Sequence, residues 1–291
     1  MKNPPFHYHR PNSVDEALAL LAEHGDDAKV LAGGQSLLPT LALRLGPPEH
    51  LIDIGRLSEL DSILVDGAAG VVIGALVRHA VAEDSADIAD HAPMVHQAMP
   101  HVGHRAIRNR GTVVGSIAHA DPAAEMPAVV LATGAEMTAR SSTGERSIGA
   151  DEFFEGYLST SLRSDELLTE VRFPALAPGT GGTVVEVSRR HGDYAMVGLA
   201  CRVQVDDGTF SDAALAFFGV DSTPVRVGAA EAVLIGQAPT DEAFVAAAEA
   251  VRATLSPGAD IHASSNYRRH VAGVLTERAL SSATEQIGVP A

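Results

Sequence analysis

The chain has 291 residues, 46% of them hydrophobic, which is enough for one large domain or for two or three smaller ones with packed cores. It carries 37 acidic against 21 basic side chains, a net charge of −16, which disfavours nucleic acid and anionic membranes as partners. No apolar run is long enough for a membrane span, and the opening residues lack the apolar core of a signal peptide, so we expect a cytoplasmic protein. The single cysteine, Cys201, can neither form an internal disulfide nor hold an iron–sulfur cluster, and its apolar strand context predicts a buried side chain.

The first 55 residues predict a small α/β lobe. Ser13 and Glu16 form a capping box before a helix to about His24, which Gly25 ends. Its apolar face is expected to consist of Val14, Ala17, Leu18 and Leu21. A strand at 29–32, a glycine turn, a helix at 37–45 and a strand at 51–54 follow, an order that predicts a βαβ unit with a parallel strand pair.

Residues 56–176 have a different pattern and predict a second lobe. Apolar residues on both sides of the segment 66–70 indicate a β-hairpin. Asp121 and Pro122 suggest the N-cap and first residue of a helix to about Ala132. The other predicted elements are a short helix from His79, a helix at 92–99 and strands at 136–140 and 167–173.

Residues 175–182 (ALAPGTGG) read as a linker, and 177–291 predict a C-terminal domain. Strands are expected at 183–190, 196–206 and 210–220, with a tight turn at Asp207–Gly208. Helices are expected at 226–236, 241–255 and 265–284. The domain is therefore predicted to be a three-stranded antiparallel sheet with three helices.

Two loops of small residues, 32–36 (AGGQS) and 112–116 (TVVGS), lie about 80 residues apart. Adjacent glycines let the backbone approach a ligand closely, and backbone N–H groups at such a turn suit a phosphate. Together the loops suggest the two sides of one diphosphate site. Neither matches the common nucleotide-binding fingerprints, so a plain strand-to-helix turn at Gly33–Gly34 is the alternative.

Short motifs spread over nearly the whole chain resemble one family. They are Pro5-Phe6 with Tyr8, residues 31–39 (LAGGQSLLP), 51–54 (LIDI), 107–112 (IRNRGT), 118–125 (AHADPAAE), 166–170 (ELLTE) and 189–195 (RRHGDYA). In this order and spacing the chain is similar to the medium, FAD-binding subunits of the molybdenum hydroxylases, and most of all to those of aerobic carbon monoxide dehydrogenases. The resemblance implies an α+β fold, with a two-lobed FAD domain of the vanillyl-alcohol-oxidase type and a C-terminal domain.

The resemblance also implies the residues that contact FAD. The first loop, with its flanks, would hold one phosphate: Leu31, Ala32, Gly33, Gly34, Gln35, Ser36 and Leu37. The second would bracket the other side: Thr112, Val114, Gly115 and Ser116. Val102 and Gly103 would lie by the adenine or ribose, and Glu125 by the ribose. Leu162, Leu167, Leu168 and Tyr194 would lie near the isoalloxazine. No catalytic residue is implied.

Four positions depart from the family pattern. Glu125 replaces the usual Asp, Gln35 a frequent His, and Val114 the usual Gly, so the Val114 side chain must point away from the phosphates. Glu186 stands where relatives often carry Lys near the flavin. A carboxylate there would not stabilise anionic reduced flavin, so we expect a different local route or a lower potential.

Histidines and arginines near these loops have simpler interpretations. His91, His96, His101 and His104 lack metal-ligand spacing, so we expect no metal site. For His79 and His119 a role behind the cofactor and an ordinary polar contact remain open. Arg105 and Arg110 are expected to be solvated, whereas Arg108 is left open between phosphate contact and solvation.

The resemblance implies electron transfer through FAD within a larger enzyme. Molybdopterin would lie on a large partner subunit and two [2Fe–2S] clusters on a small one, as a dimer of heterotrimers. Two alternatives remain: a stand-alone flavin oxidase, and an assembly subunit that has lost FAD. The substrate and the electron acceptor are not determined by this sequence.

Overall fold

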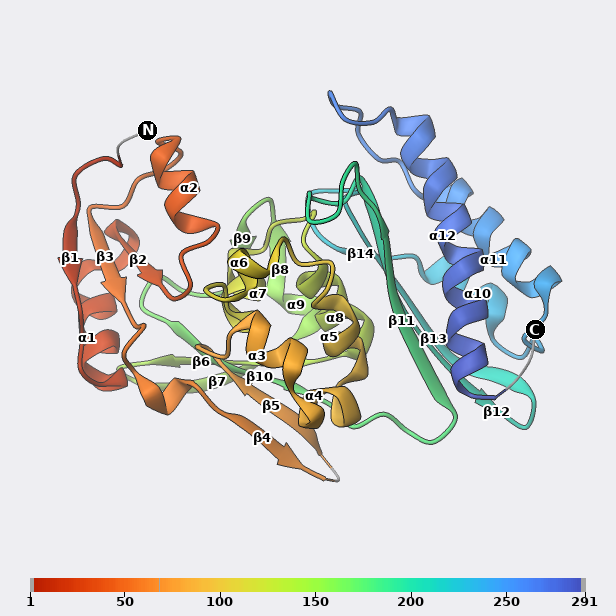
Figure 1. The fold of residues 1–291 in the computed structure, drawn as a ribbon, viewed down its shortest axis with the longest axis horizontal. Helices are drawn as coiled ribbons and strands as arrows, with labels where there is room; N and C mark the ends of the chain where they lie inside the picture. The colour runs from red at the N-terminus through yellow and green to blue at the C-terminus, as the bar shows by residue number, and fades with distance from the viewer. Residues whose placement is uncertain (1–2, 68, 289–291) are drawn as a thin grey trace.

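The computed structural model describes residues 3–67 and 69–288, which form three parts side by side (Figure 1). The first part contains β1 (His7–His9), α1 (Val14–His24), η1 (Gly25–Asp27), β2 (Ala28–Leu31), α2 (Leu37–Ala42) and β3 (His50–Asp53). β3 is the central strand and pairs in parallel with both β1 and β2. The predicted parallel pair is confirmed. β1 was missed because three residues show no periodicity.

Helix α1 forms as its sequence predicts. The Ser13 hydroxyl accepts a hydrogen bond from the Glu16 N–H, and Gly25 ends the helix with φ +52°. The Glu16 carboxylate reaches back to the N–H of Asn12 at 2.8 Å, one residue earlier than a standard capping box requires. The four predicted apolar residues are the buried ones of this helix.

The middle part is built on an antiparallel sheet in the order β4-β5-β10-β6-β7. Its strands are β4 (Ile63–Asp66), β5 (Gly70–Gly74), β6 (Glu136–Ser141), β7 (Gly144–Gly149) and β10 (Leu167–Phe173), and the small pair β8 (Phe154–Gly156) and β9 (Ser159–Thr160) lies beside it. The predicted β4–β5 hairpin is confirmed, although Ala68 in its turn lies outside the described residues.

Short helices make up most of the rest of the middle part. They are η2 (Ser58–Leu60), α3 (His79–Asp84), α4 (Ala86–His91), α5 (Pro93–Ala98), α6 (Arg105–Arg108), α7 (Val113–His119), α8 (Glu125–Thr133) and α9 (Ala150–Phe153). The predicted helix start at Asp121–Pro122 is wrong. The Asp121 carboxylate accepts from the Ala123 N–H at 2.9 Å and closes a turn, so α8 begins only at Glu125.

The third part is an antiparallel sheet in the order β11-β12-β13-β14, lying between α5 and α8 on one side and three helices on the other (Figure 1). The strands are β11 (Thr180–Val187), β12 (Val197–Asp206), β13 (Thr209–Phe218) and β14 (Val225–Arg226); the helices are α10 (Gly228–Leu234), α11 (Asp241–Thr254) and α12 (Ser265–Gln286). The predicted three-stranded sheet is wrong, because the sheet has a fourth strand, the two-residue β14. The predicted linker also overlaps β11, since Gly181 lies in that strand, where a Cβ would meet the Ala283 carbonyl oxygen of α12 at 2.0 Å.

Alternate residues of β12 and β13 belong to two cores. Ala200, Ala216 and Phe218 face the main core, which extends through the first and middle parts. Leu199 and Cys201 face the second core under α10–α12, and burial raises the pKa of the Cys201 thiol to about 12. The prediction of a buried, unreactive Cys201 agrees with this position. No helix within the described residues is long and apolar enough to cross a membrane.

Candidate functional site

The first glycine loop connects the end of β2 to the start of α2. Gly34 has φ +73°, the left-handed conformation that glycine adopts without strain. Ser36 occupies the N-cap position of α2, yet its hydroxyl makes no capping hydrogen bond. Every residue from Leu31 to Leu37 is half-buried, so the loop is accessible from outside.

The second loop is held by backbone and side-chain hydrogen bonds. The Thr112 hydroxyl caps α7 by accepting from the Gly115 N–H at 3.1 Å. The loop is pinned to residues 77–79 by bonds from Val113 N–H to the Val77 carbonyl and from His79 N–H to the Gly111 carbonyl, each 3.0 Å. Val114 is 1% exposed within the main core, so its side chain points away from the accessible side of the loop, as its interpretation requires.

The two loops meet at their backbones. A Cβ on Gly33 would lie 2.4 Å from the Arg110 carbonyl oxygen and 2.6 Å from the Gly111 Cα. A Cβ on Gly115 would lie 3.9 Å from the Cβ of Ala32. The absence of side chains at these glycines is what lets segments about 80 residues apart share one cradle.

A third segment, from the C-terminal part, closes on the same place. Gly192 has φ +83°, and a Cβ there would meet the His104 ring at 2.7 Å. Tyr194 is 61% exposed, and its hydroxyl lies near Ser36 and Asp121, both of which affect its pKa. Desolvation of this end and the Asp121 carboxylate raise the pKa of Tyr194 to about 12, so its hydroxyl stays protonated.

A buried acidic group lies behind the second loop. Burial, aided by Glu186, raises the pKa of Glu125 to about 8, which makes it largely neutral at pH 7. The Glu186 side chain is also buried, with one oxygen 3.6 Å from His101 Nδ1. The neighbouring Glu186 carboxylate raises the pKa of His101 above its ordinary value, against the effect of burial. His101 is therefore a partner of a buried carboxylate.

The remaining predicted contacts lie in different environments. Val102 is buried, and Gly103 adopts φ +50° directly after it. Leu162 is half-buried, whereas Leu167 and Leu168 on β10 are 3% and 4% exposed and belong to the main core. Of these three leucines, Leu162 offers the most open surface. Gln35 turns its amide to the Gly33 carbonyl at 3.4 Å, and Ser116 is half-buried on α7.

Arg108 has a structural role that the sequence left open. Its guanidinium is buried and binds both carboxylate oxygens of Glu83 at 2.8 and 3.0 Å, and it also donates to the carbonyls of Val102 and Gly103. Arg105 is more exposed and pairs with Glu83 and Asp84. The prediction that Arg105 is solvated is therefore incomplete, because this side chain joins a surface ion-pair network. Arg110 is exposed, as expected.

His79 is buried beneath the second loop. A Cβ on Gly111 would lie 2.8 Å from His79 Nδ1, and within the described residues neither ring nitrogen has a hydrogen-bond partner. Burial, with Arg108 and Arg78 nearby, lowers its pKa to about 4, so the ring is neutral. His119 is half-buried, and desolvation lowers its pKa as well.

One cluster was not found from the sequence. His9, His24 and His50 come from β1, α1 and β3 and bring ligand nitrogens within 4.8 Å of one another. Their separations of 15 and 26 residues match no metal motif, and β1 itself was not predicted, so no signal connected them.

Comparison with known proteins identifies the fold and its two matched segments. Residues 4–176 match the family described as the FAD binding domain in molybdopterin dehydrogenase, and residues 183–283 match the CO dehydrogenase flavoprotein C-terminal domain. The chain belongs to the FAD-binding medium subunits of the molybdenum hydroxylases. It is an oxidoreductase subunit that binds FAD.

Its relatives in this family act on different substrates. The chain is 43% identical over 284 residues to the 6-hydroxypseudooxynicotine dehydrogenase complex subunit alpha of Paenarthrobacter nicotinovorans, covering 97% of this chain and 96% of that protein. It is 39% identical over 280 residues to the carbon monoxide dehydrogenase medium chain of Hydrogenophaga pseudoflava, covering 96% and 97%. The solved carbon monoxide dehydrogenase from that organism aligns with a TM-score of 0.94 and 41% identity over 98% of this chain and 99% of that one.

The site residues suit the FAD that the family binds. The cradle between Gly33 and Gly111 leaves the first loop half-exposed, and the hydroxyl of Ser36 makes no cap bond within α2. Both features fit a diphosphate held mainly by backbone and small side chains. Metal-ligand geometry is absent from the described residues of these loops.

Proposed function

We propose that this medium subunit holds FAD between the loops 32–36 and 112–116 and passes electrons between partner-bound clusters and an external acceptor. The observation that carries the proposal is the contact between the loops at Gly33, Arg110 and Gly111. We further propose residues 1–55 and 56–176 as the lobes of the FAD domain and 177–291 as the C-terminal domain.

The first loop would bind one phosphate through its backbone N–H groups at Gly33, Gly34, Gln35 and Ser36, with the Ser36 hydroxyl as a further donor. Thr112 and Ser116 would bracket the other side, where Gly115 permits close approach. Tyr194, whose hydroxyl lies near Ser36, would lie close to the flavin ring. These assignments place binding on rigid loop backbones, so little ordering is needed when FAD binds.

Glu125 has a more specific role in this proposal. A carboxyl group with a pKa of about 8 is protonated at pH 7 and can donate a hydrogen bond. Glu125 would therefore donate toward the ribose side, next to Val102. Glu186 is held by His101 and brings no fixed positive charge to the flavin, which favours a lower potential than a lysine at this position would give.

FAD, when bound, exchanges electrons singly or in pairs, which allows it to connect one-electron clusters to varied acceptors. This chain has one cysteine, so the [2Fe–2S] clusters would come from a partner. As the family resemblance implies, the clusters would lie on a small partner and molybdopterin on a large one, assembled as a dimer of heterotrimers. The chain's own residues bind and orient the flavin and exclude water from part of it. The cytoplasmic location stays a prediction within this proposal.

The test is anaerobic reduction of the complex purified with its large and small partners. A substrate of the molybdenum subunit should first bleach the iron–sulfur absorbance and then the flavin absorbance. Clusters that become reduced while the flavin stays oxidised would overturn the proposal. Turnover of a small substrate by this chain alone would favour a stand-alone oxidase, and a chain that stays colourless with FAD would favour an assembly subunit.

A further inference from the structure

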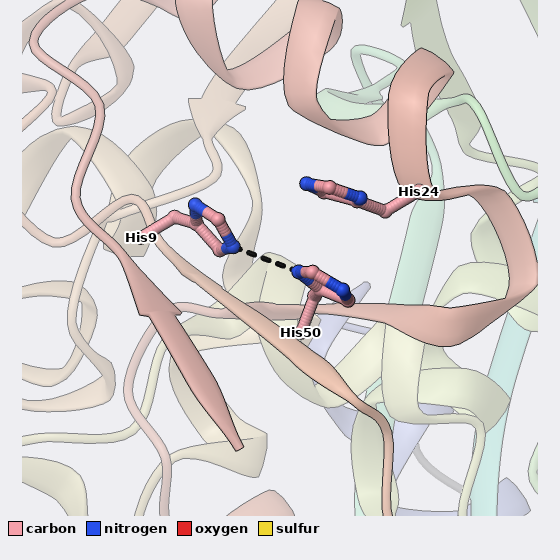
Figure 2. A group of neighbouring side chains, drawn as sticks. All are labelled: His9, His24 and His50. Atoms are coloured by element: carbon pink, nitrogen blue, oxygen red, sulfur yellow. Dashed lines mark hydrogen bonds between the residues drawn. The ribbon is translucent and has the colours of Figure 1, made fainter.

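Three histidines gather on one face of the parallel sheet of the first part (Figure 2). His9 is the last residue of β1, His24 the last residue of α1 and His50 the first residue of β3. His9 Nε2 and His50 Nδ1 are 2.9 Å apart. The His24 ring stacks over the His50 ring with centroids 3.7 Å apart and an interplanar angle of 14°.

The fold holds these three positions together. In the β1–β3 pair His7 lies opposite His50, and side chains alternate between faces along a strand, so His9 lies on the same face as both. Gly25 ends α1 with φ +52° directly after His24, which leaves His24 at the end of the helix beside that face. The cluster therefore combines three backbone elements whose arrangement is set by strand pairing and a helix stop.

The hydrogen bonds of the described residues do not account for this packing of imidazoles. Across residues 3–67 and 69–288, the His9–His50 bond is the one side-chain hydrogen bond found for the three rings. No carboxylate in this part of the chain bonds to them. Burial and the neighbouring His24, His50 and His7 lower the pKa of His9, which favours a neutral ring with a free lone pair.

We propose that His9, His24 and His50 bind one divalent transition-metal ion through imidazole nitrogens, with water completing the coordination. Imidazole suits zinc, copper and nickel, and a three-histidine set leaves an open position on a tetrahedral ion. The rings are half-buried, which gives an ion access from solvent. The assignment rests on this geometry and is independent of the flavin site.

Only modest side-chain movement is required. Zinc–nitrogen bonds of about 2.0–2.1 Å place tetrahedral ligands roughly 3.4 Å apart. The nitrogens here already lie within 4.8 Å. The His24 ring must turn from its stacked position so that a nitrogen faces the other two, and the ion replaces the direct His9–His50 hydrogen bond. His24 is half-buried at a helix end, so this rotation has room.

The bound ion would stabilise the first part of the chain, which contains the loop 32–36. His50 pairs with Ala28 at the start of β2, whereas the loop 32–36 follows Leu31 at the other end of that strand. Three strand steps separate the two ends by about 10 Å, so the ion would not touch FAD. It would instead tie β1 and α1 to β3. We expect metal to raise the thermal unfolding midpoint and to leave the flavin content unchanged.

The test uses the full-length chain without a polyhistidine tag, loaded with FAD, treated with chelator and dialysed. Titration with Zn²⁺ in a calorimeter should give one ion per chain, and Co²⁺ should give the visible absorption of a nitrogen-coordinated ion. His24→Asn and His50→Asn should each weaken Zn²⁺ binding by roughly tenfold or more. His270→Asn, on an exposed position of α12, is the matched control and should bind as the wild type does.

His24→Asn is the decisive variant because His24 lies outside the sheet pairing and its loss leaves β1 and β3 paired. Its flavin content and circular dichroism establish that it is folded. The proposal is overturned if the wild type binds no Zn²⁺ in the titration, or if folded His24→Asn binds it as tightly as the wild type.

Discussion

Gly33 and Gly111 lie so close that a Cβ on Gly33 would be 2.6 Å from the Gly111 Cα. The two residues belong to different loops, one following β2 and one preceding α7. Real Cβ contacts are not this short, so any side chain at Gly33 must push the loops apart. The distance between the two loops, and with it the proposed diphosphate site, therefore depends on glycine at position 33.

The hydroxyls of Tyr194 and Ser36 should contribute to FAD affinity. Tyr194→Phe removes a hydroxyl that lies near Ser36 and Asp121, and loss of one net hydrogen bond of about 1 kcal/mol in the FAD complex would weaken binding about fivefold. Ser36→Ala should weaken FAD binding by a similar factor. The double variant should lose less affinity than the product of the two single-variant factors. Quenching of flavin fluorescence on titration of the apoprotein measures all three.

Tyr157→Phe is the control for this cycle because Tyr157 is 67% exposed on the turn between β8 and β9. It should bind FAD as the wild type does. Strictly multiplicative effects of Tyr194→Phe and Ser36→Ala would show that the two hydroxyls do not act together.

The buried Glu125 should make stability depend on pH. Its pKa is raised from 4.5 to about 8, so the folded state keeps a proton that the unfolded state loses first. The contribution of protonated Glu125 to the free energy of unfolding is therefore fully present below pH 4.5 and is lost as the pH rises to about 8. Glu125→Gln has no such titrating group. Between pH 4.5 and about 8, the free energy of unfolding of this variant should therefore rise relative to that of the wild type, by an amount on the order of 4 kcal/mol.

Urea unfolding at the two ends of the window measures this difference. Glu152→Gln, at an exposed position of α9, tests whether the loss of any one carboxylate gives the same profile. Parallel pH profiles for the wild type and Glu125→Gln would show that Glu125 is already ionised in the folded protein.

Arg108 should be important for stability and for the second loop. Arg108→Met leaves the Glu83 carboxylate without its bidentate partner and frees the carbonyls of Val102 and Gly103, which should cost about 3–5 kcal/mol of unfolding free energy. Arg105→Met is the matched control, and its loss should be much smaller because solvent screens that exposed pair. Equal losses in denaturant unfolding would contradict this assignment.

The sequence predicted most of the elements that have a clear period. The buried face of α1, the β4–β5 hairpin and the β12–β13 pair all follow from apolar spacing. The strands β1 and β14 were missed because two or three residues carry no period, and β3 pairs with β1 only through the tertiary fold. The turn at Asp121 was misread because an aspartate followed by proline also forms a turn closed by its own carboxylate.

The sequence predicted the loops of the candidate site but not the side-chain contacts around them. The small residues at 32–36 and 112–116 are visible in the sequence, as is the need for Val114 to point inward. The pairing of His101 with Glu186, the bidentate contact of Arg108 with Glu83 and the three-histidine cluster join residues by spatial proximity alone. Their types and spacing carry no local signal, so only the structure shows them.

The most direct test of the account is the flavin content of Gly33→Val beside that of Gly149→Ala. A Cβ added at Gly149 would have no atom within 4 Å, and Gly149 has an ordinary negative φ, so it is a control within the proposed FAD domain. We predict about one FAD per purified chain for the wild type and Gly149→Ala, and almost none for Gly33→Val, with the C-terminal part still folded by circular dichroism. A folded Gly33→Val protein with full flavin content would contradict the claim that FAD lies between these two loops.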